Sequence, residues 1–163
     1  MFLRCLPLFL VLGPTAIFAS PTPANNAFPR GCEVVGFGYQ QNHLILNDTG
    51  HQTLYLIQNR SDVPIALENV ETADVFMAPK LEAQILPHFW AAFSSNEANQ
   101  HFKCMQVSDD QLQDIDCATT LDVCQYPRVK FALSNQGNYW ISTNKPQQQV
   151  IHEAASKGIY LKW

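Results

Sequence analysis

The acidic side chains are the first candidates for chemistry in this sequence. Glu68, Glu71 and Asp74 could supply the two carboxylates of a glycoside hydrolase, which lie about 5–10 Å apart. A second acidic segment, which could offer oxygen ligands to calcium, contains Asp109, Asp110, Asp114, Asp116 and Asp122. That segment lacks the D-x-D-x-D-G spacing of a calcium loop, so we interpret it as a solvated hairpin loop. The acid pair stays open as an alternative, because the sequence does not give the distance between two carboxylates.

Histidines and serines give weaker signals. The histidines stand singly, at His43, His51, His88, His101 and His152. None has the HxH or HExxH spacing typical of metal sites, so we expect surface or strand-edge residues, with a metal site built from distant strands as the alternative. Ser94 and Ser95 lack the neighbouring glycines of an exposed serine nucleophile. We therefore predict no catalytic residues, no metal and no cofactor.

Aromatic residues form the clearest candidate for a binding surface. Trp90 and Trp140 alternate with the apolar residues Phe89 and Ile141. If those neighbours face the core, both tryptophans face outward, where rings can contact sugars or partner proteins. We therefore predict a binding surface that includes Trp90, Tyr139 and Trp140. The alternative is that both faces of the sheet are covered, which would place the rings in the core.

The first nineteen residues decide how the cysteines are interpreted. One positive charge, at Arg4, precedes an almost wholly apolar run at residues 5–18, and Ala19 offers a small residue for cleavage. This layout predicts a secretory signal peptide at residues 1–19, because the run is shorter than the roughly 20 residues of a spanning helix. The exported chain is expected to be periplasmic or secreted.

Removal of the signal peptide leaves four of the five cysteines. They are Cys32, Cys104, Cys117 and Cys124. An even set in an exported chain predicts two disulfides, and four cysteines allow three pairings. We favour Cys32–Cys124 with Cys104–Cys117, because the first ties the start of the domain to its second half and the second closes the acidic hairpin.

Size and charge exclude several kinds of partner. The chain has 163 residues and a formal net charge of −4, without a cluster of lysines or arginines. Such a chain is a poor candidate for nucleic acid binding, and we expect no membrane insertion. Residues 20–30 are rich in proline and have no apolar period, which predicts a flexible leader. Residues 31–163 are then expected to form a single domain.

Short apolar runs separated by turn signals indicate a mainly β structure. We expect strands at residues 33–39, 43–46, 53–58, 65–70, 74–77, 81–86, 89–93 and 101–107. A hairpin is predicted at residues 128–143, then a helix from a cap at Asn144 to Gly158, and a closing strand at residues 159–163. The predicted fold is an antiparallel β-sandwich of short strands with one C-terminal amphipathic helix.

Several longer strings resemble a known family. VCQYPRVKFALSNQGNYWISTNK, the final GIYLKW, CEVVGFGYQ and LYLIQNRSDVPIALENVE are similar to the enhanced-entry protein B (EnhB) family of Legionella-type bacteria. The resemblance implies a small periplasmic protein, associated with bacterial entry into host cells, and it implies no catalytic residues. We therefore expect a non-enzymatic binding or assembly protein whose partner is another envelope protein or cell-wall glycan. The alternative is a small envelope enzyme that acts on glycan through an acid pair.

Overall fold

The computed structural model describes residues 28–35, 37, 43–47, 53–70, 81–95, 99–108, 111–127 and 138–163. Within these residues the strands are β1 (Glu33–Val34), β2 (His43–Asn47), β3 (Thr53–Asn59), β4 (Ile65–Asn69), β5 (Leu81–Ile85), β6 (Trp90–Ser95), β7 (Asn99–Ser108), β8 (Gln111–Asp114), β9 (Leu121–Pro127) and β10 (Asn138–Lys145). The helices are α1 (Cys117–Thr120) and α2 (Gln147–Ser156). The predicted signal peptide, the strand at residues 74–77 and the first half of the late hairpin lie outside the described residues.

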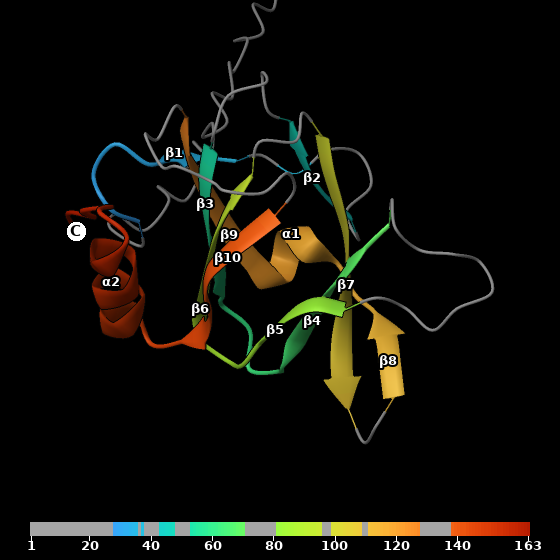
Figure 1. The fold of residues 1–163 in the computed structure, drawn as a ribbon. Coiled ribbons are helices and arrows are strands. Elements are labelled where there is room, and N and C mark those ends of the chain that lie inside the picture. The colour runs from blue at the N-terminus through green and yellow to red at the C-terminus, as the bar shows by residue number, and fades with distance from the viewer. Residues whose placement is uncertain are drawn as a thin grey trace, which may run out of the picture.

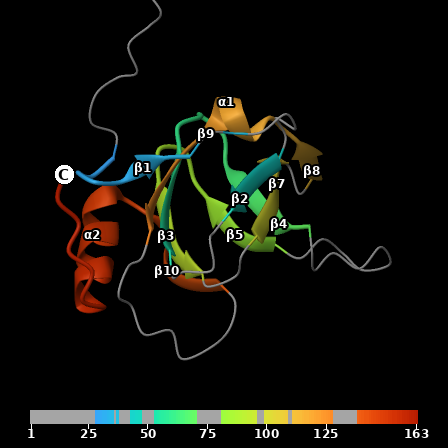
Figure 2. The same ribbon diagram turned by 90° about the horizontal axis from the view of Figure 1, so that it is seen from above.

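The strands form two antiparallel sheets that face each other (Figure 1). The first sheet has the strand order β1-β9-β3-β6-β10, and we call it the helix-covered sheet. The second has the order β2-β7-β4-β5, with β8 paired to the far end of β7, and we call it the open sheet. Viewed from above, α2 lies along the outer side of the helix-covered sheet, so the molecule has three layers (Figure 2). This confirms the predicted sandwich with a C-terminal helix.

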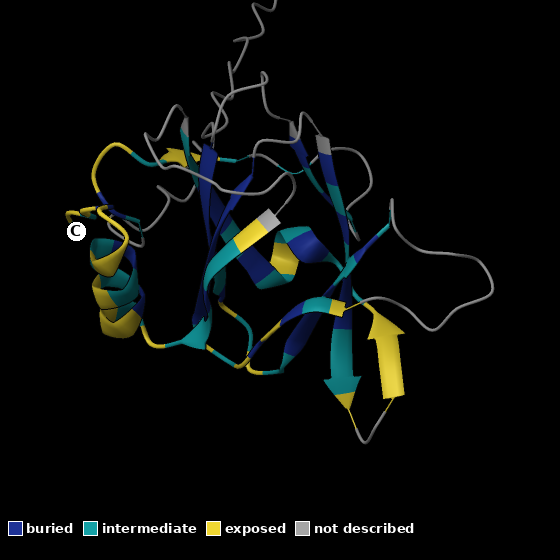
Figure 3. Cartoon of the chain, in the orientation of Figure 1, coloured by how far each residue is buried: buried dark blue, intermediate teal, exposed yellow. Residues whose placement is uncertain are grey.

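The main core fills the space between the two sheets (Figure 3). Alternate residues of β2, β3, β4, β6, β7 and β9 enter it, as expected for half-buried strands. Its buried members are Leu44, Leu46, Tyr55, Ile57, Ile65, Leu67, Ile85, Ala91, Phe93, Phe102, Cys104, Cys117, Leu121 and Val123. Phe93 stacks near Tyr55, with ring centroids 5.0 Å apart, and so links two neighbouring strands. Because residues from both sheets meet in this layer, it holds the sandwich together.

A second apolar layer lies between the helix-covered sheet and α2. Val150 and Ala154 of α2 are buried against Leu54, Leu56 and the residues of β6 that point away from the main core. As a consequence β3 and β6 are buried on both faces. The helix ends where Gly158 takes a positive φ of 80°, and its neighbour Ile159 donates its backbone N–H to the carbonyl of Ala154.

Both predicted disulfides are confirmed. Cys32–Cys124 joins the segment before β1 to β9, and its Cα atoms are 5.6 Å apart. Cys104–Cys117 joins β7 to α1, with Cα atoms 5.4 Å apart, and encloses β8. Paired cysteines of this kind indicate an oxidising environment outside the cytoplasm.

Two details of the sequence-based prediction are wrong. Residues 159–163 do not form a closing strand. Among the described residues, the backbone bond that joins them to the segment 28–32 runs from the Arg30 N–H to the Lys162 carbonyl. Asn144 does not cap α2, because it takes a positive φ of 55° and its side chain accepts the Leu86 N–H; the N-cap is Pro146. Of the predicted flexible leader at residues 20–30, only residues 28–30 are described, and Phe28 there packs on the sheet.

The disulfides should differ in their contribution to stability. In the Cys104→Ala/Cys117→Ala variant the remaining disulfide is Cys32–Cys124, which joins residues 92 positions apart. Reducing it should lower the free energy of unfolding by about 4.5 kcal/mol. Reducing Cys32→Ala/Cys124→Ala breaks only the bridge across 13 residues, and should cost about 3 kcal/mol. Urea unfolding compares each variant in its oxidised and its reduced state. The effect of the alanine substitutions on stability is the same in both states, so the difference measures the disulfide alone. An equal or reversed order would contradict this prediction.

Candidate functional site

Trp90 does not belong to an exposed surface. Its side chain is only 4% exposed and lies between the helix-covered sheet and the C-terminal segment. The rings of Phe28 and Trp163 meet it edge to face, each with its centroid 5.7 Å away. The predicted outward orientation of Trp90 is therefore wrong. The alternation with Phe89 is real, but the second face of β6 is covered by α2 and the C-terminal segment.

Trp140 lies on the opposite face of the same sheet. It packs at the margin of the main core, 4.7 Å from the ring of Phe93, and its indole Nε1 donates to Glu82 Oε2 at 3.3 Å. Its neighbour Ile141 faces α2 instead. Tyr139 is 37% exposed on the edge strand β10. The three predicted residues therefore do not form one continuous binding surface.

The acidic residues of the segment 109–122 are used separately. Asp114 pairs with Lys103 at 2.8 Å, and Asp122 pairs with Arg60 at 3.3 Å. Asp116 caps α1, since its side chain accepts the Ala118 N–H at 2.8 Å. Asp109 and Asp110 lie outside the described residues. Among the residues that the structure describes, no group of three or more His, Cys, Asp or Glu side chains is placed to hold a metal ion.

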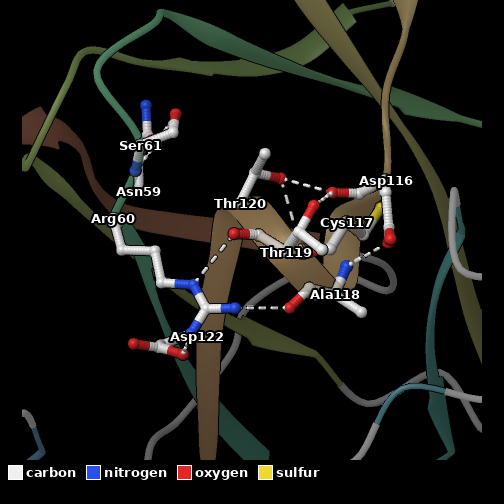
Figure 4. Close-up of polar contacts among 9 residues, drawn as sticks. All are labelled: Asn59, Arg60, Ser61, Asp116, Cys117, Ala118, Thr119, Thr120 and Asp122. Carbon is white, nitrogen blue, oxygen red and sulfur yellow. Dashed lines mark hydrogen bonds and ion pairs between the residues drawn. The ribbon is translucent and has the colours of Figure 1, made fainter.

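Arg60 connects the start of the β3–β4 turn to the end of α1 (Figure 4). Its Nε donates to the Thr119 carbonyl at 3.0 Å, and Nη2 donates to the Ala118 carbonyl at 2.6 Å. Asp122 holds the third nitrogen of the guanidinium group. Helix ends leave carbonyl groups without partners inside the helix, and a planar arginine fork is suited to bonding two of them. We assign this network a structural role, because its contacts are made within the chain.

Two of the histidines lie together. Nδ1 of His43 on β2 contacts Nε2 of His101 on β7, and the ring centroids are 4.6 Å apart. Burial lowers the pKa of His43 below its usual value of 6.5, and His101 and Lys103 lower it further, whereas Asp114 acts in the opposite direction. These effects favour the neutral form of the His43 ring. Sequence reasoning missed this pair, because the two residues are far apart in the chain.

The remaining histidines lie apart from this pair. His88 is exposed on the turn that leads into β6, and its Nε2 lies 3.1 Å from an oxygen of Asp62. His152 is exposed on α2. His51 lies outside the described residues.

The described residues do not test the alternative of an enzyme that acts through an acid pair. Ser94 and Ser95 are fully buried in β6, where a hydroxyl nucleophile could not reach a substrate. Of the proposed acid pair, Glu68 is half-buried on β4, and Glu71 and Asp74 lie outside the described residues. A glycan-cleaving acid pair therefore stays a prediction.

A hollow of about 360 Å³ lies beside the C-terminal segment, and we call it the basic hollow. Its lining residues are Arg30, Tyr126, Gly158, Ile159, Tyr160, Leu161 and Lys162. Arg30 and Lys162 are exposed, and the Tyr160 side chain is 77% exposed, so their polar groups and the ring are accessible to a ligand. None of these lining residues is acidic. The basic hollow thus offers two cations and an aromatic ring on a chain whose net charge is negative.

Segments distant in sequence hold the basic hollow in shape. The turn at Pro29–Cys32 is closed by the Cys32 N–H donating to the Pro29 carbonyl, and Gly31 supplies the positive φ of 85°. Tyr126 donates its hydroxyl to the Arg30 carbonyl at 3.1 Å. Burial raises the pKa of Tyr126, which keeps this hydroxyl protonated as a donor. The sequence-based prediction missed the basic hollow because it assigned Arg30 to the leader and Tyr160 to a strand.

Comparisons with known proteins add no assignment. No protein-family model, curated protein or solved structure shows significant similarity to this chain. The resemblance to the enhanced-entry protein B family therefore stays a prediction. In the described part of the chain, neither helix combines the length and apolar character that crossing a membrane requires.

Replacing Trp90 should test its place in the core. Trp90→Ala removes a ring that two other aromatic side chains contact, and should lower the free energy of unfolding by about 3–5 kcal/mol. Tyr139→Ala, at an exposed edge, should change it by less than about 1 kcal/mol. Urea unfolding of the oxidised variants measures both, and Trp90→Phe provides a milder variant if Trp90→Ala does not fold. Equal effects at the two positions would contradict the assignment.

Arg60 should contribute to stability through its three contacts. Arg60→Gln loses the fork that bonds α1 and leaves Asp122 without its partner, which should cost about 1–2 kcal/mol. The matched control is Arg30→Gln, because Arg30 bonds to the other described residues through its backbone atoms. That control should stay within about 0.5 kcal/mol of the wild type in the same urea titration. If both variants unfold at the same urea concentration, the Arg60 network is not stabilising.

Proposed function

We propose that this chain is an exported, non-enzymatic binding protein of the bacterial cell envelope, and that it holds an acidic cell-wall glycan in the basic hollow. The observation that carries the proposal is the arrangement of Arg30, Lys162 and the exposed ring of Tyr160 around one hollow. This arrangement replaces the predicted surface at Trp90 and Trp140, which the fold divides between two faces of a sheet.

The chemistry of the basic hollow favours a ligand that is both anionic and ring-shaped. An arginine guanidinium binds carboxylates or phosphates through two parallel hydrogen bonds, and a lysine adds a second positive charge. An exposed tyrosine ring offers a flat apolar surface against which the face of a sugar can pack. Cell-wall glycans that carry carboxylates combine both features, so Tyr160 would contact the sugar and Arg30 its acidic group.

The walls of the basic hollow are held in place before a ligand arrives. Cys32–Cys124 attaches the Arg30 turn to β9, and the bond from Arg30 N–H to the Lys162 carbonyl joins that turn to the C-terminal segment at 2.7 Å. A preformed site loses less conformational entropy on binding than a mobile one. This supports recognition of a ligand by a fixed surface.

The groups around the basic hollow support binding rather than catalysis. Its described lining contains no carboxylate and no histidine that could act as a general base. The pKa of Tyr126 is raised, and its hydroxyl donates a hydrogen bond to a backbone carbonyl, so the side chain stays neutral. The lining therefore provides groups that hold an anion without transferring protons to it.

The cellular setting in this proposal rests on different grounds. The two disulfides favour an oxidising compartment outside the cytoplasm. The periplasmic location and the association with entry into host cells rest on the predicted signal peptide and on the resemblance to the enhanced-entry protein B family. Export can be checked separately, by N-terminal sequencing of the protein recovered from the envelope.

Binding to cell-wall glycan tests the proposal. Soluble acidic fragments, released from cell wall by a muramidase, are titrated into the oxidised chain by calorimetry. Tyr160→Ala and Arg30→Gln should each weaken binding by about tenfold, because each removes a principal contact. The controls are Tyr139→Ala, another exposed tyrosine, and Lys157→Gln, an exposed cation that does not line the basic hollow.

The controls decide between the basic hollow and less specific attraction. If Lys157→Gln weakens binding as much as Arg30→Gln, general charge attraction accounts for the result and the hollow is not the site. If Tyr139→Ala is the damaging aromatic change, the site lies at β10 instead. No measurable binding by the folded wild type would reject glycan as the ligand.

A further inference from the structure

We propose that His43 and His101 form a binding site for a divalent transition-metal ion on the outer face of the open sheet. This site lies on the other sheet from the basic hollow and does not depend on the glycan proposal. It is assembled by the pairing of β2 with β7, and the two imidazole rings are its protein ligands.

Strand pairing brings one nitrogen of the His43 ring into contact with one nitrogen of the His101 ring. In the antiparallel pair, Leu44 lies opposite Phe102, and both point into the main core. His43 and His101 precede these residues on their strands, so they lie on the other face and diagonally across from each other. Nδ1 of one ring and Nε2 of the other then face each other directly. The two facing nitrogens share a hydrogen bond in the metal-free chain, and an ion bonded to both, at about 2.0–2.1 Å from each, would need the rings to move slightly apart.

The surroundings of the two rings can accept added positive charge. Lys103 lies directly opposite His43 in the strand pair, but Asp114 pairs with it at 2.8 Å. Glu68 lies opposite Lys103 in the pairing of β4 with β7 and so shares this face. The two carboxylates outnumber the one ammonium group. Both histidines are partly exposed to solvent.

The ligand set indicates which metal ions would bind. Neutral imidazole favours Cu²⁺, Ni²⁺ and Zn²⁺, and for a given nitrogen site Cu²⁺ binds most tightly. In the described residues no third side chain completes the set, so water molecules would occupy the other coordination positions. Without metal, the N–H of one ring donates a hydrogen bond to the facing nitrogen of the other ring. A metal ion can bond to both facing nitrogens only if neither carries a proton. The ring that donates the hydrogen bond therefore changes tautomer, so that its proton moves to its other nitrogen.

The proposal is tested by metal titration of the oxidised, tag-free chain. Calorimetry with Cu²⁺ and with Ni²⁺ should show one saturable site in the wild type. His43→Ala and His101→Ala should each weaken it by at least about tenfold, because each removes half of the protein ligands. The matched controls are His152→Ala and His88→Ala, which remove histidines that lie apart from the pair. Both should bind as the wild type does.

Spectroscopy of the copper complex provides a second readout. Its electron paramagnetic resonance spectrum should show two equatorial imidazole nitrogens in the wild type, and fewer in His43→Ala or His101→Ala. Circular dichroism of the metal-free variants checks that they are folded; if either alanine variant is not, His43→Gln and His101→Gln replace it. Retention of the wild-type affinity in folded variants of both histidines, or loss of it in His152→Ala, would overturn the proposal. So would the absence of a saturable site in the wild type.

Discussion

The structure depends on the burial of one sheet from both sides. β3 and β6 at its centre contact the open sheet on one face and α2 on the other, so nearly every side chain of these strands is inaccessible to water. Apolar burial contributes about 25 cal/mol per Å², and a strand covered twice contributes on both faces. The other elements are arranged around this sheet. α2 and the C-terminal segment cover it on the outside, and Trp90 is enclosed between them.

The disulfides attach the elements of the fold that contribute least to the buried layers. β1 has only two residues and both are exposed, yet Cys32–Cys124 ties its start to β9. β8 is exposed along its length, and Cys104–Cys117 closes the loop that contains it. Arg60 and Asp116 then fix the short helix α1 at its two ends. Covalent and polar contacts thus replace apolar burial at the margins of the domain.

Both proposed sites lie at these margins, where distant segments meet. The basic hollow combines a turn before β1 with the segment that follows α2, and one backbone hydrogen bond joins them. The histidine pair lies on an edge strand and its neighbour. The central sheet offers no comparable surface, because its side chains are already packed. A margin held by a disulfide or by strand pairing can be both accessible and rigid, which is what a binding site requires.

The class of fold and most strand positions followed from the sequence alone, and the structure selected the favoured cysteine pairing from the three that the sequence allowed. Alternating apolar residues and turn signals are local, and they placed β3, β4, β5 and β7 to within a few residues. Only the tertiary structure decided which second faces are covered. The alternation around Trp90 was predicted correctly, but its exposure was not, because α2 packs on that face. The same reason applies to both sites: His43 meets His101, and Arg30 meets Lys162, only through long-range packing that no local pattern encodes.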